Sequence, residues 1–366
     1  LWPVQDGSYE IDASYFDFDA VDHQLYKPSL MALLGEPRDI RKSFSFGLES
    51  QESITEDDQR YADIAASLQF VLEEIVLGLC KRLKELSGLN NLCIAGGVAM
   101  NCLVNTAIVK SNLFENVFIP SDPGDGGAAT GAALLGNGHS VIVDKPSAYL
   151  GSGVENVAIG AFLDESFLYS AFQETNPGNC PAINGFTILE DMPEDRLIQE
   201  TINDLTAGKI VGWVQGRFEF GPRALGNRSL LVDPSNMEAM KRLSQTVKNH
   251  VSFRPYALSI QAEAATRILD CDYTEQPILR WMQSIWPVKG EHCNSLRAGI
   301  HVDGTTRPQI CAFEDNPLFW NLLTQFGEQR GLPALLNTSF NERGLPMVAT
   351  ATQALMTFMR TGIDTL

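Results

Sequence analysis

The fourteen residues from Gly216 to Ser229 carry the side chains best suited to chemistry in this chain. They include three arginines and three glycines, and they follow the apolar run from Ile210 to Val214, which predicts a strand. Arginine forks match phosphate and carboxylate oxygens, and glycines let a backbone approach a ligand closely. Because the chain is otherwise acidic, this arginine loop indicates a small anionic ligand rather than a polyanion. The alternative is a surface turn whose arginines are solvated or salt-bridged.

Further cations and amides occur in other loops of the second half. Lys248 and Arg254 precede a predicted strand, and Arg307 lies beside two threonines. Asn337 and Ser339 belong to a polar loop that follows an apolar run. Each feature alone is weak evidence for a ligand site. Together with Arg223 of the arginine loop, these side chains are of the types that bind a phosphate or acyl phosphate, provided that the loops converge in space.

Two glycines in the first half follow a predicted strand and open a helix. Gly96 and Gly97 can turn backbone N–H groups toward a phosphate or nucleoside, and the helix N-terminus adds a favourable dipole. The amide of Asn101 is suited to bond a ribose or a base. The alternative is tight helix–strand packing that requires small residues.

An acidic, glycine-rich turn runs from Asp122 to Gly131. Asp125 is flanked by glycines, and its carboxylate could coordinate a divalent ion. From these residues alone, an Asp that caps the following helix is the favoured alternative. The five histidines include no HxxxH or HExxH pair, so no complete metal site is visible, and a GxSxG elbow is also missing.

The elements that must position these residues alternate between helix and strand. Thr55 predicts the N-cap and Gly88 the end of a long helix with an apolar stripe that includes Ile75. Two strand–glycine loop–helix units then predict an α/β domain with ligand loops at the carboxyl ends of its strands. Predicted strands are 92–95, 117–119, 210–214, 256–260, 299–302 and 333–336, and predicted helices are 97–109, 128–135, 194–207, 316–326 and 351–360. Gly362 is a plausible C-cap, and residues 363–366 resemble the start of a strand.

The bulk properties set the class of protein. A length of 366 residues favours two domains, with a boundary in the weakly patterned stretch 137–187. A net charge of −18 argues against a nucleic-acid binder, and no run approaches the roughly 20 apolar residues of a membrane span. Seven cysteines without a CxxC pair indicate reduced thiols in a cytoplasmic protein, with Cys80, Cys93 and Cys102 expected in the core.

Six motifs occur in one order: GGVAMN, PGDGGAATGAAL, GRFEFGPRALGNRSLLVDP, VKNHVSFRPYALSI, HVDGTTRP and LLNTSFNERGLP. With them the chain resembles the O-carbamoyltransferases of antibiotic and nodulation-factor biosynthesis, the family of nodulation protein U and the cephalosporin and tobramycin carbamoyltransferases. The resemblance runs from about Ala95 to the C-terminus.

The resemblance implies an α/β fold in two parts. Residues 1–150 would be the C-terminal part of a Kae1-like domain of the actin/Hsp70 ATPase class, and 151–366 a YrdC-like mixed α/β domain. The second part would use ATP, with Mg²⁺, and carbamoyl phosphate to make carbamoyl-adenylate. The first part would pass the carbamoyl group to a hydroxyl of a small-molecule acceptor, such as an antibiotic, a sugar or a nodulation factor, with a metal, typically iron, near the adenylate.

The same resemblance assigns roles to individual positions. The residues implied for carbamoyl phosphate and nucleotide are Arg223, Lys248, Arg254, Arg307, Asn337 and Ser339. Gly96, Gly97 and Asn101 fall in the adenylate loop, and Asp125 falls on the metal-binding aspartate.

One departure from the family pattern is the absence of the upstream HxxxH metal motif. Since residue 1 is Leu and both ends look cut, we expect the chain to be the C-terminal portion of a longer enzyme that cannot transfer the carbamoyl group by itself. Two alternatives stay open: a threonylcarbamoyl-adenylate enzyme that acts on tRNA, and a non-catalytic nucleotide-binding protein. The acceptor and the oligomeric state are not predicted.

Overall fold

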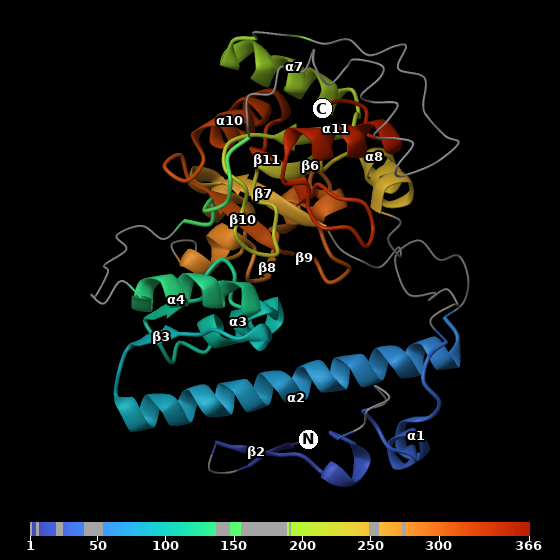
Figure 1. The fold of residues 1–366 in the computed structure, drawn as a ribbon, viewed down its shortest axis with the longest axis vertical. Coiled ribbons are helices and arrows are strands. Elements are labelled where there is room, and N and C mark those ends of the chain that lie inside the picture. Colours follow the sequence, from blue (N-terminus) through green and yellow to red (C-terminus); the bar gives the residue numbers. More distant parts are fainter. Residues whose placement is uncertain are drawn as a thin grey trace.

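The computed structural model describes residues 2–4, 7–19, 25–39, 54–136, 147–154, 189, 192–248, 256–272 and 276–366. In Figure 1 the N-terminal segment and the long helix α2 lie at the bottom, a small α/β layer lies above them, and the largest sheet lies at the top. No helix in these ranges is both long and apolar enough to cross a membrane.

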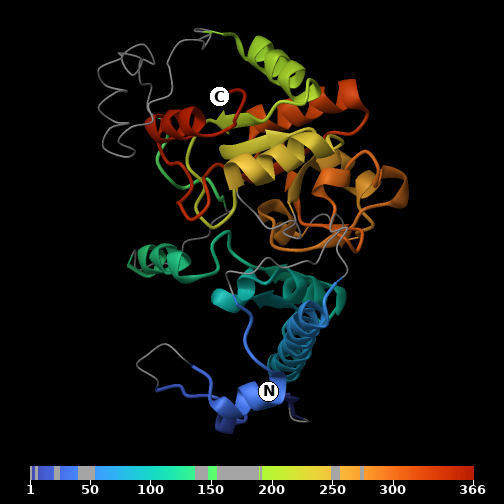
Figure 2. The ribbon, with the colours of Figure 1, turned by 90° about the vertical axis from the view of Figure 1, so that its right-hand side faces the viewer.

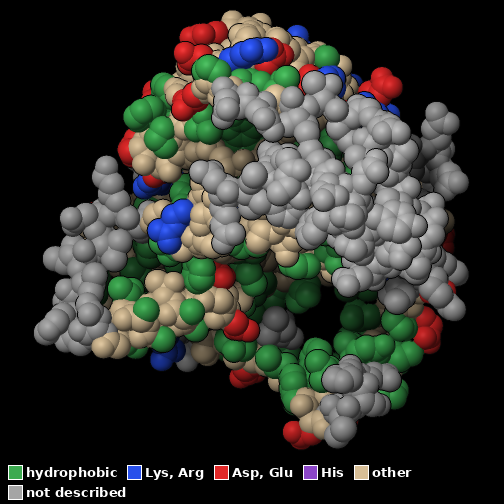
Figure 3. Space-filling view, turned by 45° about the horizontal axis from the view of Figure 1, so that its top comes forward, with side chains coloured by type: hydrophobic (Ala, Val, Ile, Leu, Met, Phe, Trp, Pro, Cys, Tyr) green, Lys and Arg blue, Asp and Glu red, His purple; other side chains and the backbone are tan. Residues whose placement is uncertain are grey.

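The first part is built around α2 (Glu56–Ser87), which follows β1 (Trp2–Pro3), β2 (Tyr9–Glu10) and α1 (Pro28–Leu34). The predicted ends are confirmed: the Thr55 hydroxyl accepts from the N–H of Asp58 at 3.0 Å, and Gly88 takes a left-handed φ of 66°. The predicted apolar stripe is only partly covered. Ile75 is buried, but the Leu86 side chain is 76% exposed. A hollow lined mainly by apolar side chains lies between α1 and the first half of α2, and Figure 3 shows apolar side chains gathered on the lower part of the molecule.

A parallel pair of strands follows, β3 (Asn91–Cys93) and β4 (Asn116–Phe118), with α3 (Cys102–Lys110) and α4 (Ala128–Gly136). Both predicted strand–loop–helix units are thereby confirmed. Cys80 and Cys102 are buried as expected, whereas Cys93 is exposed. The prediction for Cys93 was wrong because alternate side chains of a strand point to opposite faces, and here Leu92 takes the buried one.

The second part is a mixed five-stranded sheet in the order β10-β7-β11-β6-β5. Its strands are β5 (Val211–Val214), β6 (Arg228–Val232), β7 (Ala257–Gln261), β10 (Pro308–Cys311) and β11 (Ala334–Ser339). Helices α7 (Glu194–Thr206) and α10 (Pro317–Arg330) pack on one face, where Leu231 and Leu335 point. Residues of α8 (Met237–Arg242) and α11 (Ala351–Arg360) pack with Leu230 and Leu336 on the other (Figure 2).

Two sequence predictions failed in this part. Residues 299–302 are not a strand: a 3₁₀ turn ends at Gly299, and the chain reverses at Gly304, whose φ is +81°. The strands come later, as β9 (Thr305–Thr306), which pairs with β8 (Trp286–Pro287), and as β10. A short helix, α9 (Ala265–Ile268), and β6 were not predicted. Residues 228 and 229, which the sequence predicts within the arginine loop, belong to β6.

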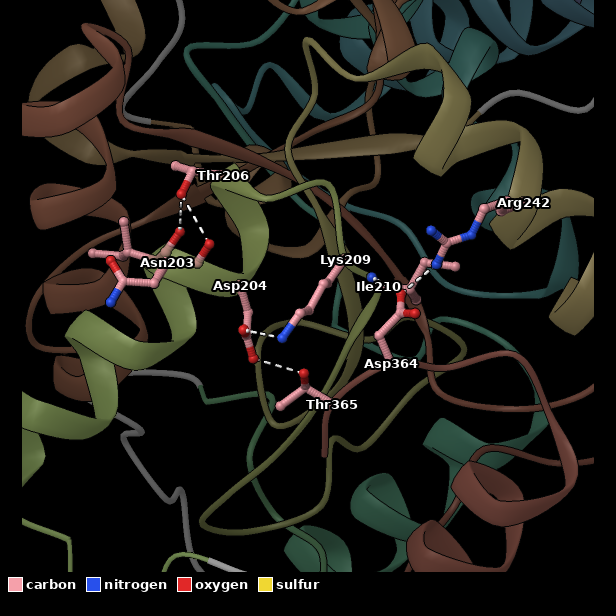
Figure 4. A network of polar contacts seen from close by, with 9 residues as sticks. Asn203, Asp204, Thr206, Lys209, Ile210, Arg242, Asp364 and Thr365 are labelled. Carbon is pink, nitrogen blue, oxygen red and sulfur yellow. Dashed lines mark hydrogen bonds and ion pairs between the residues drawn. The ribbon is translucent and has the colours of Figure 1, made fainter. Parts of the chain in front are cut away.

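Polar contacts tie the C-terminal residues to α7, to the residue before β5 and to α8 (Figure 4). Thr365 forms a parallel bridge with Val211, as the predicted strand start requires. The Thr365 hydroxyl donates to Asp204 at 2.6 Å, and the Asp364 carboxylate accepts from the N–H of Ile210 at 2.7 Å. Gly362 is not the C-cap of α11, because Thr361 takes that place in an extended conformation.

The two parts share one apolar core. Ile108 and Ile119 belong to the same buried cluster as Leu258 and Trp286. Polar contacts also join them, since the Asn105 amide donates to the carbonyl of Gln283 at 2.9 Å. The predicted boundary at residue 150 stays a prediction.

Candidate functional site

Strand pairing brings the predicted ligand loops to one edge of the five-stranded sheet. The end of β11 at Ser339 pairs with Ser229 at the start of β6. Asn337 pairs with Ala257 at the start of β7, and Leu258 pairs with Pro308 at the start of β10. The arginine loop precedes β6, and Arg307 precedes β10, so both lie at the edge where β11 ends. The convergence that the sequence left open follows from this topology.

Hydrogen bonds fix the arginine loop to the strands immediately after Arg223. The Asn337 amide donates to the carbonyl of Ala224 at 3.2 Å and to the hydroxyl of Ser259 at 2.8 Å. The Gln309 amide donates to the carbonyl of Leu225 at 2.8 Å. Arg223 is therefore held beside Asn337, whose side chain is 1% exposed.

The three arginines of the loop have different surroundings. Arg217 donates to the carbonyls of Gly151 at 2.9 Å and Leu150 at 2.8 Å. Arg228 is fully buried, and its guanidinium donates to backbone carbonyls, among them Gln215 at 2.5 Å. Arg223 is half-buried and makes no hydrogen bond or ion pair with any residue that the structure describes. Of the three, Arg223 is the one whose fork is available to an anion.

Lys248, which ends a π-helical turn that begins at Leu243, is enclosed by oxygens. Its side chain is 2% exposed, and its Nζ donates to the carbonyl and hydroxyl of Ser339, the latter at 3.1 Å. It also donates to the backbone and side-chain oxygens of Asn341 at 3.1 and 2.7 Å. Lys248 therefore holds the loop after β11 in place. Arg254 lies outside the described residues.

Replacing Lys248 with methionine is expected to lower the free energy of unfolding by about 1–3 kcal/mol, because part-buried oxygens of Ser339 and Asn341 lose their donor. Chemical denaturation measures this change. Lys81→Met, at an exposed position of α2, is the matched control and should stay close to wild type. Equal stability of the two variants would show that the Lys248 contacts do not support the loop.

Arg307 lies close to His301 at the same edge. Burial lowers the pKa of His301, and the positive charge of Arg307 lowers it further, against the opposing effect of Asp303. The ring Nδ1 lies 3.0 Å from the hydroxyl of Thr305, which itself donates to Asp303 at 2.6 Å. The lowered pKa favours the neutral form of His301, so the positive charge near it comes from Arg307.

The glycine loop of the first part has open space in front of it. Gly96 takes a φ of +101°, and a Cβ added at Gly96 or Gly97 would meet no atom within 4 Å. Packing among the described residues therefore does not require these glycines, so that alternative is wrong. Asn101 caps α3 through the N–H groups of Leu103 and Val104, both at 3.1 Å. A role for Asn101 in ligand binding stays a prediction.

The acidic turn neither caps a helix through Asp125 nor forms a metal cluster in the described part of the chain. Asp125 is exposed, Gly124 is the N-cap residue, and the Asp125 carboxylate has no hydrogen bond to a described residue. Asp122 instead accepts from the N–H of Gly124 at 3.2 Å. No group of three or more His, Cys, Asp or Glu side chains that could hold a metal is found among the described residues.

The glycine, acidic and arginine loops meet where the two parts join. The N–H of Gly96 donates to the carbonyl of Pro123 at 2.7 Å. Gly221 takes a φ of +134°, and a Cβ there would lie 2.5 Å from the carbonyl oxygen of Ser121. The arginine loop therefore rests against the acidic loop, and the acidic loop against the glycine loop. Such a junction offers cations and backbone N–H groups to one anionic ligand.

Comparison with known proteins identifies the family. The model of the carbamoyltransferase N-terminus matches residues 4–134, and the model of the carbamoyltransferase C-terminus matches residues 202–366. This chain belongs to the carbamoyltransferase family. The resemblance inferred from its motifs is thereby confirmed.

Named relatives agree with that assignment. Nodulation protein NolO of Bradyrhizobium diazoefficiens is 35% identical over 314 residues, or 84% of this chain and 54% of that protein. The 3'-hydroxymethylcephem-O-carbamoyltransferase of Streptomyces clavuligerus is 31% identical over 261 residues, or 71% and 44%. Nodulation protein U of Sinorhizobium fredii is 29% identical over 285 residues, or 77% and 46%. The chain thus spans about half the length of these relatives.

Within this member of the carbamoyltransferase family, several polar residues at the site do not stand out from the sequence. They are Glu219, Ser259, Gln309 and Asn341. Asn341 and Ser259 lie inside quoted motifs, and Glu219 lies inside the arginine loop, so the positions of these three residues could have drawn attention to them. Ser259 and Gln309 also lie within strands, where sequence alone does not show which face they occupy.

Proposed function

We propose that this chain takes part in ATP-dependent O-carbamoyl transfer. Its C-terminal part would convert carbamoyl phosphate and ATP to carbamoyl-adenylate, and the carbamoyl group would then pass to a hydroxyl of a small-molecule acceptor. The observation that carries the proposal is the convergence of Arg223, Arg307, Asn337 and Ser339 at one sheet edge. In the same proposal, residues 1–150 belong to a Kae1-like domain and 151–366 to a YrdC-like domain.

The proposed reaction places negative charge where the site offers donors. Water first hydrolyses carbamoyl phosphate, which releases inorganic phosphate and leaves carbamate. A carbamate oxygen then attacks the α-phosphorus of ATP, and the bond to the departing pyrophosphate breaks. Arg223, which has no partner among the described residues, would bind the phosphate and offset repulsion between the two anions.

In this proposal the glycine loop would receive the nucleotide. A Cβ added at Gly96 or Gly97 would meet no atom within 4 Å, and a phosphate or ribose would bind there near the backbone N–H groups that lead into α3. The contact with Pro123 links this loop to the acidic turn, and through Gly221 to the arginine loop. These contacts support a pathway in which the adenylate forms at the sheet edge and then donates its carbamoyl group at the glycine loop of the first part.

Carbamoyl-phosphate-dependent exchange of pyrophosphate into ATP tests the proposal. Exchange is expected with carbamoyl phosphate and not with threonine, bicarbonate and tRNA. Exchange that needs the latter set would favour the threonylcarbamoyl-adenylate alternative, although the net charge of −18 is unfavourable for tRNA. ATP binding without exchange in any mixture would favour the non-catalytic alternative.

The described residues alone do not fit an iron site, since Asp125 lacks partner ligands there. We keep Asp125 as a proposed metal ligand that needs further ligands. Asp125→Asn is expected to lower bound iron, measured by atomic absorption, and to leave pyrophosphate exchange within about twofold of wild type, because adenylation uses the other part. Asp57→Asn, at an exposed position in the first turn of α2, is the control. Unchanged iron content, or equal loss of exchange, would remove Asp125 from the metal site.

A further inference from the structure

A buried carboxylate closes the arginine loop. Glu219 is 1% exposed, and its Oε1 accepts three backbone N–H groups. They belong to Leu225 at 2.7 Å, Asn227 at 2.9 Å and Arg228 at 3.1 Å. These bonds join the first half of the loop to its last residues and leave Arg223 in the closed segment between them.

The Glu219 carboxylate bonds to the loop backbone rather than to the Arg223 side chain. Burial raises the pKa of Glu219, and the three N–H groups act against that rise. The nearby Arg228 guanidinium is occupied by carbonyl groups, among them that of Ala349 at 3.2 Å. The second oxygen, Oε2, is buried and has no hydrogen-bond partner among the described residues. Glu219 therefore holds the loop backbone through the hydrogen bonds of Oε1. Among the described residues it makes no ion pair with Arg223, so it does not neutralise that cation.

Other contacts fix both ends of the closed segment. The N–H of Phe220 donates to the carbonyl of Ala148 at 2.6 Å. At the other end, the Tyr149 hydroxyl donates to the carbonyl of Leu225 at 2.9 Å, and the Asn316 amide donates to the side-chain oxygen of Asn227 at 2.9 Å. The Arg223 side chain has no such support, so the course of the loop backbone determines where it lies.

We propose that Glu219 is a positioning residue, whose carboxylate oxygen holds the loop backbone so that Arg223 faces carbamoyl phosphate. The role of Arg223 in this statement rests on the proposed function. The closed loop itself does not, because its hydrogen bonds join only residues of this chain. The proposed role requires an oxygen at the position that the Glu219 side chain reaches. Two conservative substitutions separate the effect of side-chain length from the effect of charge.

Glu219→Gln keeps the length and one oxygen but removes the charge, whereas Glu219→Asp keeps the charge but is one methylene too short to reach all three N–H groups. We expect E219D to raise the KM for carbamoyl phosphate about tenfold in pyrophosphate exchange, with kcat and the KM for ATP changed by less than about threefold. E219Q should stay within about threefold of wild type in all three constants. Arg217→Ala, which loses contacts at the base of the loop, is the control and should resemble E219Q.

Amide hydrogen exchange gives a readout that needs no activity. The N–H groups of Leu225, Asn227 and Arg228 should exchange about tenfold faster in E219D and remain protected in E219Q. Unchanged protection in E219D would overturn the loop closure, whatever the enzyme does. An E219Q variant as impaired as E219D would also overturn the proposal, because an oxygen in the right position would then not suffice without the negative charge. A wild-type chain without carbamoyl-phosphate-dependent exchange would refute the proposed function, and amide protection alone would then decide the role of Glu219.

Discussion

Replacing Arg223 with alanine is expected to lower kcat/KM for carbamoyl-phosphate-dependent pyrophosphate exchange by at least about tenfold, since a charged hydrogen bond contributes roughly 1.5–3 kcal/mol. Arg223 makes no hydrogen bond or ion pair with a described residue, so its removal leaves no buried group without a partner. Thermal stability should therefore stay close to wild type. Steady-state exchange assays and calorimetry measure the two quantities.

Two further variants sharpen this test. Arg223→Lys keeps the charge but loses the planar fork, and its activity should fall between wild type and Arg223→Ala. Arg217→Ala removes a neighbouring arginine that is bound to the carbonyls of Leu150 and Gly151 and should leave exchange nearly unchanged. A wild-type rate in Arg223→Ala would refute the assignment of this residue to the ligand site.

Arg228→Met is expected to reduce the free energy of unfolding by about 3–5 kcal/mol, the range for breaking a buried charged interaction from one side. The guanidinium is fully buried and donates to the carbonyls of Gln215 at 2.5 Å and Ala349 at 3.2 Å. Its loss would leave these acceptors unsatisfied and remove the positive charge beside the buried Glu219. Equilibrium urea unfolding measures the change.

A surface arginine provides the control for Arg228. Arg196 lies 3.8 Å from Glu200 on α7, and both side chains are well exposed. Arg196→Met should change stability by less than about 0.5 kcal/mol, as is usual for exposed helix pairs. If Arg228→Met is as stable as this control, the buried arginine does not support the loop, and its contacts contribute little.

The sequence by itself determined the local structure and the family. Thr55 and Gly88 predicted the ends of α2 because capping depends on residues within one turn of the helix terminus. Glycine loops after apolar runs predicted the order of strands and helices in the first part. The motifs indicated the carbamoyltransferase family, and the family models confirm that membership. The prediction of a strand at 299–302 was wrong because the turn at Gly304 places the residues that pair in a sheet farther along the chain.

Only the tertiary structure decided which residues of those motifs are available to a ligand. Arg217, Arg223 and Arg228 are identical in type and lie within the segment 216–229, yet two of them bind backbone carbonyls and Arg223 does not. The register that sets Asn337 opposite Ala257 joins residues 80 positions apart, and no local pattern encodes such a pairing. Burial of Lys248 and Glu219 likewise depends on segments that fold over them from elsewhere. Residue type and spacing fix local geometry, whereas the partners of a buried polar group are set by long-range packing.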